Sequence, residues 1–382
     1  MSTNTGNVAK KHEKTGMKTS DNSCTVQVID SLEQWQPVAE GWNTLLAKSL
    51  SNTIFLTWEW LFSWAKCFLN PERKLFVICI YQSEQLIGIA PFYLRQQKNK
   101  LPALRQIRFL GSPETGSDYL DVIIQKGKEK LVAGLLYEYL YTAGRAQWDE
   151  LRLTDIPSES LFLLHFLNRV EEQGKFSEIH RCAVMPQTKL PEQKDTFLLS
   201  LSSNRRERFR RDMRRLHQEG EAEHIIHDGT DIKNGLNRFF KLYNTKSGYD
   251  GTKLHTFFNT LDTINDAKHW LQVDILCARN NDIAGLLHLR YGNNILMLLM
   301  VVDKTFNRKI SFGNLLVGMC MQNAIENNLR TYDFLKGDEE YKFHWSTDMR
   351  TTMSISINQR HPLAILATVG RLMKYAIKTI SR

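Results

Sequence analysis

The chain has 382 residues, 42% of them hydrophobic and 24% charged, an ordinary globular composition that excludes a disordered or fibrous protein. This length exceeds what one hydrophobic core usually serves, so we expect two domains. The formal net charge of +9 favours anionic partners, but it does not distinguish phosphates, nucleic acid and acidic membrane surfaces.

Several further classes are disfavoured by the distribution of apolar residues and cysteines. No apolar run approaches the roughly 18 to 20 residues that span a bilayer. The six cysteines lie far apart without a CxxC pair, which predicts neither a metal site nor a disulfide framework. Residues 1–23 are polar and lack the apolar centre of a secretory signal, so they predict a disordered tail. We therefore expect a cytoplasmic protein.

The first half of the chain predicts alternating helices and strands from the spacing of its apolar residues. The expected helices are 32–49, 57–68 with Thr57 as its cap, 128–143 and 158–172. The expected strands are 75–81, 85–94, 106–110, 119–124, 150–153, 179–184 and 196–201. The stretch 185–194 holds two prolines, which interrupt helices and strand ladders. It is the expected boundary between a first domain, 24–190, and a second, 191–382.

The second half repeats the order of elements. Its expected helices are 204–218, 231–246, 253–267 and 312–327, and its expected strands are 221–227, 270–278, 282–291, 294–302, 331–335 and 352–358. The hairpin motif Gln85-Leu86-Ile87-Gly88-Ile89-Ala90 also matches Asp282-Ile283-Ala284-Gly285-Leu286-Leu287. A shared order and a shared motif predict a duplication, with two tandem α/β domains built on mixed sheets.

The segment from Val301 to Asn314 leads from a strand through a loop into a helix. Small residues at Ser311 and Gly313 let a ligand approach the backbone, where unpaired amides and the positive end of the helix dipole favour an anion. The candidate residues for a carrier pyrophosphate are Val302, Arg308, Lys309, Ser311, Phe312, Gly313 and Asn314. An ordinary strand-to-helix loop remains the alternative.

This loop resembles a motif of the GNAT acetyltransferase superfamily. The family motif Arg/Gln-x-x-Gly-x-Gly/Ala holds the pyrophosphate of coenzyme A, and Arg308-Lys309-Ile310-Ser311-Phe312-Gly313 is similar to it. Ser311 stands where the first glycine is usual, and serine disfavours positive φ, so the anion-binding turn is altered. The resemblance implies acetyl-CoA or another acyl-CoA as the donor substrate.

A second motif narrows the resemblance. Tyr332-Asp333-Phe334-Leu335-Lys336-Gly337-Asp338-Glu339-Glu340-Tyr341-Lys342, followed by Trp345, is similar to the signature that closes the CelD/BcsL-like branch of this superfamily. That branch is related to the Fem-type aminoacyltransferases, and its members are two-domain transferases linked to polysaccharide or cell-surface biosynthesis. The resemblance covers roughly residues 51–345.

Acyl transfer needs a proton acceptor, a proton donor for the leaving group and a positive group near the oxyanion. Asp338, Tyr341 and Lys342 can supply these three roles in that order. A capped turn with Lys342 paired to a neighbouring carboxylate is the alternative. His255 and His344 are further candidate bases, because imidazole titrates near neutrality.

Two other regions are candidates for binding the acceptor. Asp118, Tyr119 and Asp121 resemble an Asp-Tyr-x-Asp segment of the family and are expected to line a cleft between the domains, although a capped turn fits equally well. Arg205 belongs to a basic helix, 204–216, that suits an anionic acceptor or the end of transfer RNA. A solvated helix face is the alternative, and duplex DNA is not expected.

Three functions follow from these features. The first is transfer of an acyl group, with acetyl expected, from acyl-CoA to an amine or hydroxyl of a small molecule or glycan precursor, without a metal. The second is a Fem-type transfer from aminoacyl-tRNA, and the third is a non-catalytic scaffold in polysaccharide biosynthesis.

The basic, apolar segment 362–382 predicts an amphipathic helix that packs on the core or contacts the inner membrane face peripherally.

Overall fold

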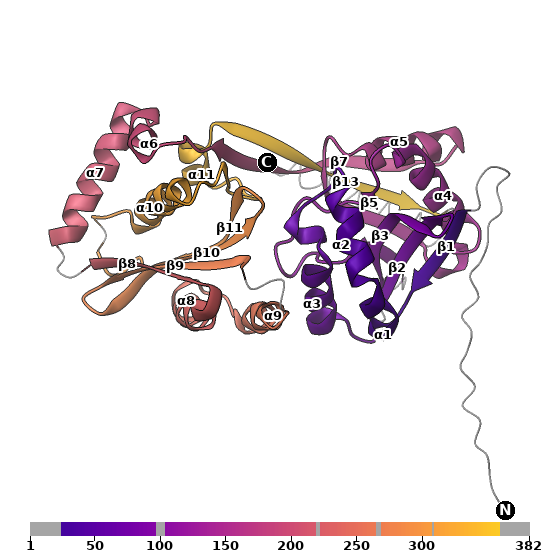
Figure 1. Cartoon of the computed structure of the whole chain (residues 1–382), viewed down its shortest axis with the longest axis horizontal. Coiled ribbons are helices and arrows are strands. Elements are labelled where there is room, and N and C mark those ends of the chain that lie inside the picture. The colour runs from indigo at the N-terminus through magenta and orange to yellow at the C-terminus, as the bar shows by residue number, and fades with distance from the viewer. Residues whose placement is uncertain (1–23, 97–103, 219–221, 265–268, 308, 360–382) are drawn as a thin grey trace, which may run out of the picture.

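The computed structural model describes residues 24–96, 104–218, 222–264, 269–307 and 309–359. The predicted tail at 1–23 and the predicted helix at 362–382 lie outside these residues. Within them, no helix combines the length and the apolar character that crossing a membrane requires. Figure 1 shows two lobes side by side, the first coloured indigo to magenta and the second mostly pink to orange.

The first lobe is a mixed sheet with helices packed on it. Its strands are β1 (Cys24–Ile29), β2 (Arg73–Gln82), β3 (Gln85–Gln96), β4 (Arg105–Phe109), β5 (Ile123–Ile124), β6 (Glu150–Pro157) and β7 (Ser177–Lys189). Its helices are α1 (Leu32–Trp35), η1 (Gln36–Val38), α2 (Ala39–Ala47), η2 (Ile54–Leu56), α3 (Trp58–Phe68), α4 (Glu129–Tyr141), η3 (Arg145–Gln147) and α5 (Leu161–Glu172).

The second lobe repeats this plan. Its helices are α6 (Lys194–Ser200), α7 (Ser203–Gln218), η4 (Gly229–Asp231), α8 (Ile232–Lys246), α9 (Thr252–Asp262), α10 (Phe312–Glu326) and α11 (Glu340–Trp345). Its strands are β8 (Ala222–Asp228), β9 (Leu271–Ala278), β10 (Asn281–Tyr291), β11 (Asn294–Val302) and β12 (Thr331–Asp333), and the last described strand, β13 (Asp348–Asn358), pairs with β6 and β7. Helices α8 and α9 cover one face of the β8–β11 sheet, and α10 covers the other (Figure 1).

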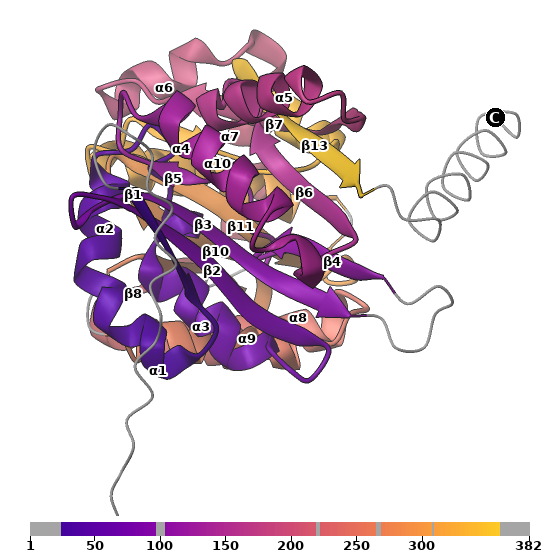
Figure 2. The same ribbon diagram turned by 90° about the vertical axis from the view of Figure 1, so that its right-hand side faces the viewer.

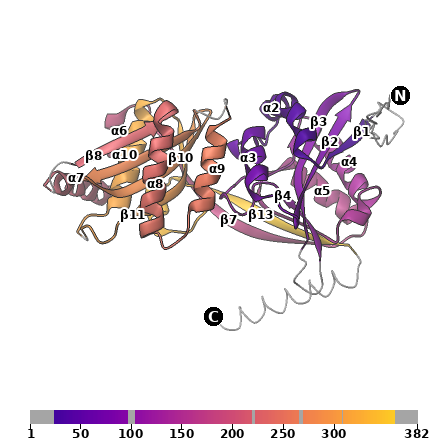
Figure 3. The same ribbon diagram turned by 90° about the horizontal axis from the view of Figure 1, so that it is seen from below.

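One continuous sheet joins the lobes, in the order β1-β2-β3-β4-β6-β13-β7-β12-β11-β10-β9-β8. The long strands β7 and β13 run from one lobe into the other (Figure 3). Strand β13, from the end of the described chain, lies between β6 and β7, while the end of β7 pairs with β12. Strands from before and after the predicted domain boundary at residues 190 and 191 therefore pair with one another. The division of the chain at that boundary stays a prediction.

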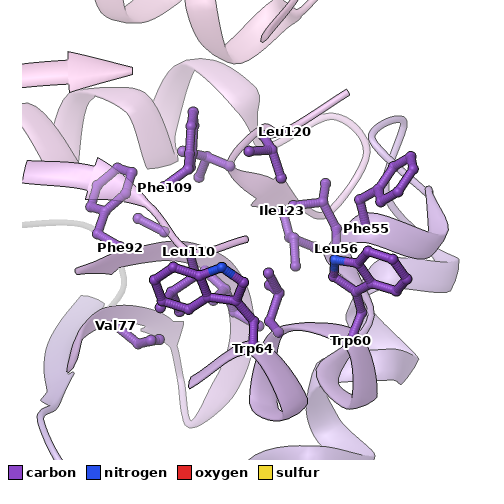
Figure 4. Close-up of a cluster of buried hydrophobic side chains, with 14 of the residues drawn as sticks. Phe55, Leu56, Trp60, Trp64, Val77, Phe92, Phe109, Leu110, Leu120 and Ile123 are labelled. Carbon is purple, nitrogen blue, oxygen red and sulfur yellow. The ribbon is translucent and has the colours of Figure 1, made fainter. Parts of the chain in front are cut away.

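Helix α3 anchors the core of the first lobe and its contact with the second. Thr57 caps it by accepting a hydrogen bond from the Trp60 amide, as its sequence predicts. Trp60 and Trp64 are fully buried among the aromatic and aliphatic side chains that Figure 4 shows. The Trp60 ring also lies 4.9 Å from Phe257 of α9, in an edge-on contact. Seen end-on in Figure 2, α3 and α9 lie along the same lower side of both lobes.

Most predicted elements are confirmed, including the predicted strand 85–94, which forms β3, and the three successive strands β9–β11, which form an antiparallel meander. The predicted strand 196–201 is wrong, because this segment forms α6. In the predicted strand 119–124 only Ile123 and Ile124 pair, since Tyr119 has a φ of 54° that extended backbone does not allow. Strand β1 and helix α11 were not predicted from the sequence.

The packing of α7 on α10 is tested by a glycine. A Cβ on Gly318 would overlap the ring of Phe209 and lie 3.1 Å from Trp345 Cη2. We expect Gly318→Ala to destabilise the protein by about 1–3 kcal/mol in urea denaturation, because the added methyl overpacks this contact. The control is Gly134→Ala in α4, where a Cβ meets nothing within 4 Å and helix propensity should stabilise by up to about 1 kcal/mol. Equal stabilisation by both variants would contradict the close packing.

Candidate functional site

Strands β11 and β12 separate shortly after they meet. They pair in parallel only from Asn294 with Thr331 to Leu296 with Asp333. Leu298 is then an extra residue in the β10–β11 ladder, because Leu287 pairs with Leu299 and His288 with Met297. Such bulges bend a strand and often lie beside active sites. The separation leaves the later part of β11 without β12 beside it.

Helix α10 begins at the far end of β11 and offers free donors. Ser311 precedes it with φ of −87°, and its hydroxyl accepts a hydrogen bond from Asn314 Nδ2 at 2.9 Å. The amides of residues 312–314 have no acceptor within the described part of the chain. These donors and the helix dipole make the start of α10 suitable for an anion. Ser311 leads into this helix start without the positive φ that a glycine at this position of the family motif permits.

Some of the other predicted carrier residues pack in the core of the second lobe, and others lie in the loop before α10. A Cβ on Gly313 would lie 3.2 Å from Met300 Sδ and 3.3 Å from Val302 Cγ2, so this glycine serves the close approach of α10 to β11. Phe312 is buried in the core of the second lobe. Exposed Lys309 lies in the loop, and its carbonyl accepts a hydrogen bond from the α7 residue Arg215 at 2.9 Å.

Arg308 lies outside the described residues. The hydrogen bond from Arg215 to the Lys309 carbonyl places the basic helix α7 next to the loop between β11 and α10, which is the predicted carrier loop. From the sequence, helix α7 and this loop were two separate features, because nearly a hundred residues lie between Arg215 and Lys309.

The segment after β12 holds a buried ammonium group. Lys342 is 5% exposed, and its Nζ donates a hydrogen bond to the Lys336 carbonyl at 2.6 Å and lies 3.1 Å from Glu339 Oε2. Gly337 lies below these groups with a φ of 153°, and a Cβ there would overlap both Lys342 Nζ and the Glu339 carboxylate. Glycine at this position therefore leaves the room that the ammonium occupies.

The remaining predicted catalytic residues differ in location. Asp338 is exposed and Tyr341 is half-buried beside Lys342, and burial raises the pKa of the Tyr341 phenol well above its usual range. His344 is partly exposed, with Nε2 3.4 Å from Glu340 Oε1. His255 is not brought near them. It stacks on Phe240 of α8, on the sheet face opposite α10, and burial lowers its pKa.

A cavity of about 190 Å³ lies where α7, α10 and α11 meet. Its lining residues are Asn204, Arg205, Arg208, Phe209, Asp212, Asn314, Leu315, His344 and Trp345. Trp345 Nε1 donates to Asn314 Oδ1 at 3.1 Å, which joins α11 to the first turn of α10. The predicted carrier loop and the segment after Gly337 thus lie on the same side of the molecule. Arg205, a predicted acceptor-binding residue, lines the cavity between them and α7.

The first-lobe candidates are all buried, and two of them link the lobes. The Tyr119 hydroxyl donates to Asp333 Oδ2 at 2.8 Å, and Asp118 Oδ2 accepts the Lys336 amide at 3.0 Å. Asp121 accepts from the Ser51 hydroxyl at 2.8 Å. Burial raises the pKa of Asp118 to about 7 and that of Asp121 to about 6. None of the three lines the α7–α10–α11 cavity.

A buried polar network in the second lobe was missed. Asp274 accepts from His224 Nε2 at 2.8 Å and from His288 Nδ1 at 2.9 Å, and His288 Nε2 lies 2.7 Å from the Tyr332 hydroxyl. Burial alone would raise the pKa of Asp274, but the two imidazoles hold it below its usual range. His224, Asp274 and Cys320 have donor atoms within 4.8 Å of one another, a set that could hold a metal where none was predicted. The sequence did carry a signal for this network, because Asp274 and His288 are polar residues within the mostly apolar strands β9 and β10.

Comparisons with known proteins find a family similarity within the second half of the chain. Residues 203–343 match the model of a family described as an acetyltransferase (GNAT) domain. The comparison with curated proteins gives no match. Among solved structures, FemX is similar with a TM-score of 0.59 and 11% identity, over 86% of this chain and 98% of that chain.

Two further structures share the fold. L-PGS from Bacillus licheniformis has a TM-score of 0.51 and 12% identity, over 88% of this chain and 96% of that one. The C-terminal domain of a protein from Agrobacterium fabrum, named as a lysylphosphatidylglycerol synthetase, has a TM-score of 0.50 and 9% identity, over 89% and 97%. The chain therefore has a tandem mixed α/β fold, and its residues 203–343 are similar to the GNAT acetyltransferase domain family.

Proposed function

We propose that this protein transfers an acyl group, with acetyl expected, from acyl-CoA to an amine or hydroxyl of a sugar or cell-surface precursor. We further propose that it belongs to the CelD/BcsL-like branch and acts in the cytoplasm, with peripheral membrane contact as an accompanying hypothesis. The observation that carries the proposal is the free first turn of α10 lying beside the segment that holds Lys342.

The chemistry assigns one role to each polar side chain. As the acceptor attacks the thioester carbonyl, a new bond to carbon forms and negative charge develops on the carbonyl oxygen, which the Lys342 ammonium stabilises. Asp338 accepts the proton that the acceptor loses, with His344 as the other candidate. The carbon–sulfur bond then breaks, and Tyr341 donates its proton to the leaving thiolate. The Tyr341 phenol carries this proton at neutral pH, although burial raises its pKa and so makes it a weaker acid.

Transfer from aminoacyl-tRNA is the second candidate. It is supported by the similarity to FemX over most of both chains and by the arginines that α7 presents beside the carrier loop. The same carbonyl chemistry applies, with a ribose hydroxyl in place of the thiolate. A scaffold without catalysis is the third candidate, and it predicts that neither donor binds.

Calorimetry with acetyl-CoA tests the donor. We expect Lys309→Glu to weaken binding about tenfold or more, because a phosphate contact becomes a repulsion. Lys304→Glu is the control, since Lys304 is exposed at the other end of the same loop and should change affinity less than about threefold. Gly313 is unsuited to this test because it packs against β11. Absence of acetyl-CoA binding by the unmodified protein would refute the coenzyme A proposal.

A further inference from the structure

The α7–α10–α11 cavity contains a buried acceptor without a donor. Asp212 is 4% exposed, lines this cavity, and its Oδ1 has no hydrogen-bond partner among the described residues. The nearest cations, Arg211 Nε at 3.7 Å and Arg215 Nη1 at 3.9 Å, lie beyond hydrogen-bond distance. An unsatisfied buried acceptor costs about 1–3 kcal/mol, so a ligand N–H that reached Asp212 would recover that energy.

The walls of the cavity suit a flat ring. Phe209, Leu315 and Trp345 form its apolar sides, and the Trp345 ring is held edge-on to Phe209 at 6.4 Å. His344 adds a further ring system at the cavity. Aromatic side chains bind nucleic-acid bases by stacking, which is worth about 1–3 kcal/mol per base. A volume of about 190 Å³ leaves space for one heteroaromatic ring system rather than for a whole carrier molecule.

Positive charge lies next to these walls. Arg205 and Arg208 line the cavity from the exposed side of α7, and Asn314 belongs to the first turn of α10 whose amides are free. Guanidinium groups bind phosphate oxygens with two parallel hydrogen bonds. Aromatic walls, a buried carboxylate oxygen without a donor and adjacent cationic and amide groups together match one kind of ligand, a nucleotide.

We propose that this cavity binds the adenine nucleotide end of the acyl carrier, with the exocyclic amine of the base donating to Asp212. The Asp212 carboxylate can only accept hydrogen bonds, and the 6-amino group of adenine supplies an N–H donor. The base stacks beside Trp345, and the phosphates extend toward Arg208 and the start of α10. This inference rests on the proposed function in that the nucleotide belongs to a donor, and both donor classes share it: coenzyme A contains adenosine, and transfer RNA ends in it.

Calorimetry of the full chain with adenosine 3′,5′-bisphosphate tests the base site. We expect the inosine analogue, which carries a 6-oxo group, to bind about tenfold more weakly or worse, because its oxygen faces the carboxylate. Asp212→Asn should reduce this preference to about threefold or less, since the amide can also donate. Equal affinity of the unmodified protein for the two nucleotides, or no binding of either, overturns the proposal without any variant.

A matched pair of arginines separates specific binding from general attraction. Arg208→Met should weaken the bisphosphate about tenfold, because it removes a phosphate contact in the cavity. Arg214→Met is the control, since Arg214 is on the same helix outside the cavity and pairs with Glu207 at 3.9 Å. Similar weakening by both variants would mean that the nucleotide is attracted by the charge of α7 alone, which overturns the site.

Competition identifies the source of the nucleotide. Displacement of the bisphosphate by acetyl-CoA supports a coenzyme A donor, and displacement only by an RNA hairpin that ends in CCA, but not by one that ends in CC, supports transfer RNA. Base preference without acyl transfer would leave the site standing and refute the proposed function. Acyl transfer without base preference would refute the site alone.

Discussion

Replacing Lys342 with methionine is expected to lower kcat about a hundredfold or more, while donor affinity changes less than about threefold. The reason is that, in the proposed mechanism, the buried Lys342 ammonium stabilises the charge that develops on the carbonyl oxygen in the transition state. An interaction gained only in the transition state affects kcat rather than binding. Steady-state kinetics with saturating acetyl-CoA, together with calorimetry of the donor, measure the two quantities.

The neighbouring Lys336→Met is the matched control for this experiment. It removes an ammonium that pairs with Asp155 at 2.6 Å, yet it keeps the main-chain carbonyl that accepts the Lys342 hydrogen bond. We expect this variant to retain kcat within about fivefold, as for a charge outside the reacting centre. Thermal melting checks that both variants fold. Normal turnover in Lys342→Met would reduce this lysine to a structural partner of Glu339.

The Asp118→Asn variant is expected to be more stable than the unmodified protein at pH 8, and the difference should shrink as the pH falls toward 4. Burial holds the pKa of Asp118 at about 7, well above its ordinary value of 3.8. The folded protein therefore binds a proton that the unfolded chain has released between these two values. The stabilisation from this proton is fully present below about pH 3.8 and is lost as the pH rises through about 7.

The groups around Asp118 set the size of this effect. Asp155 and Asp333 raise its pKa further, whereas the amide and the ammonium of Lys336 lower it. A shift of this size corresponds to at most about 4 kcal/mol, and relaxation of the site should leave a few kcal/mol. The asparagine keeps an acceptor for the Lys336 amide. Urea denaturation from pH 4 to 8 measures the difference, with exposed Asp338→Asn as the control. An unchanged pH slope in Asp118→Asn would assign the effect to other carboxyls.

Local patterns in the sequence were enough to predict several parts of the fold. The cap at Thr57, the β2–β3 hairpin and the β9–β11 meander depend on residues close together in the chain. The strand–loop–helix segment before Phe312 was predicted for the same reason. The misassigned segment 196–201 shows the limit, because a short apolar run fits a helix or a strand equally well.

The sequence by itself determined the two-lobed α/β plan and the strand–loop–helix segment around Ser311, because apolar periodicity, caps and small residues act over a few neighbouring positions. Only the tertiary structure decided that β13 lies between β6 and β7, that Asp118 joins the lobes, and that Asp212 and Trp345 share one cavity. It also separated His255 from the other candidates by placing it across the sheet. These relations join residues that are far apart along the chain, where packing and long-range strand pairing choose among arrangements that local preferences leave equal.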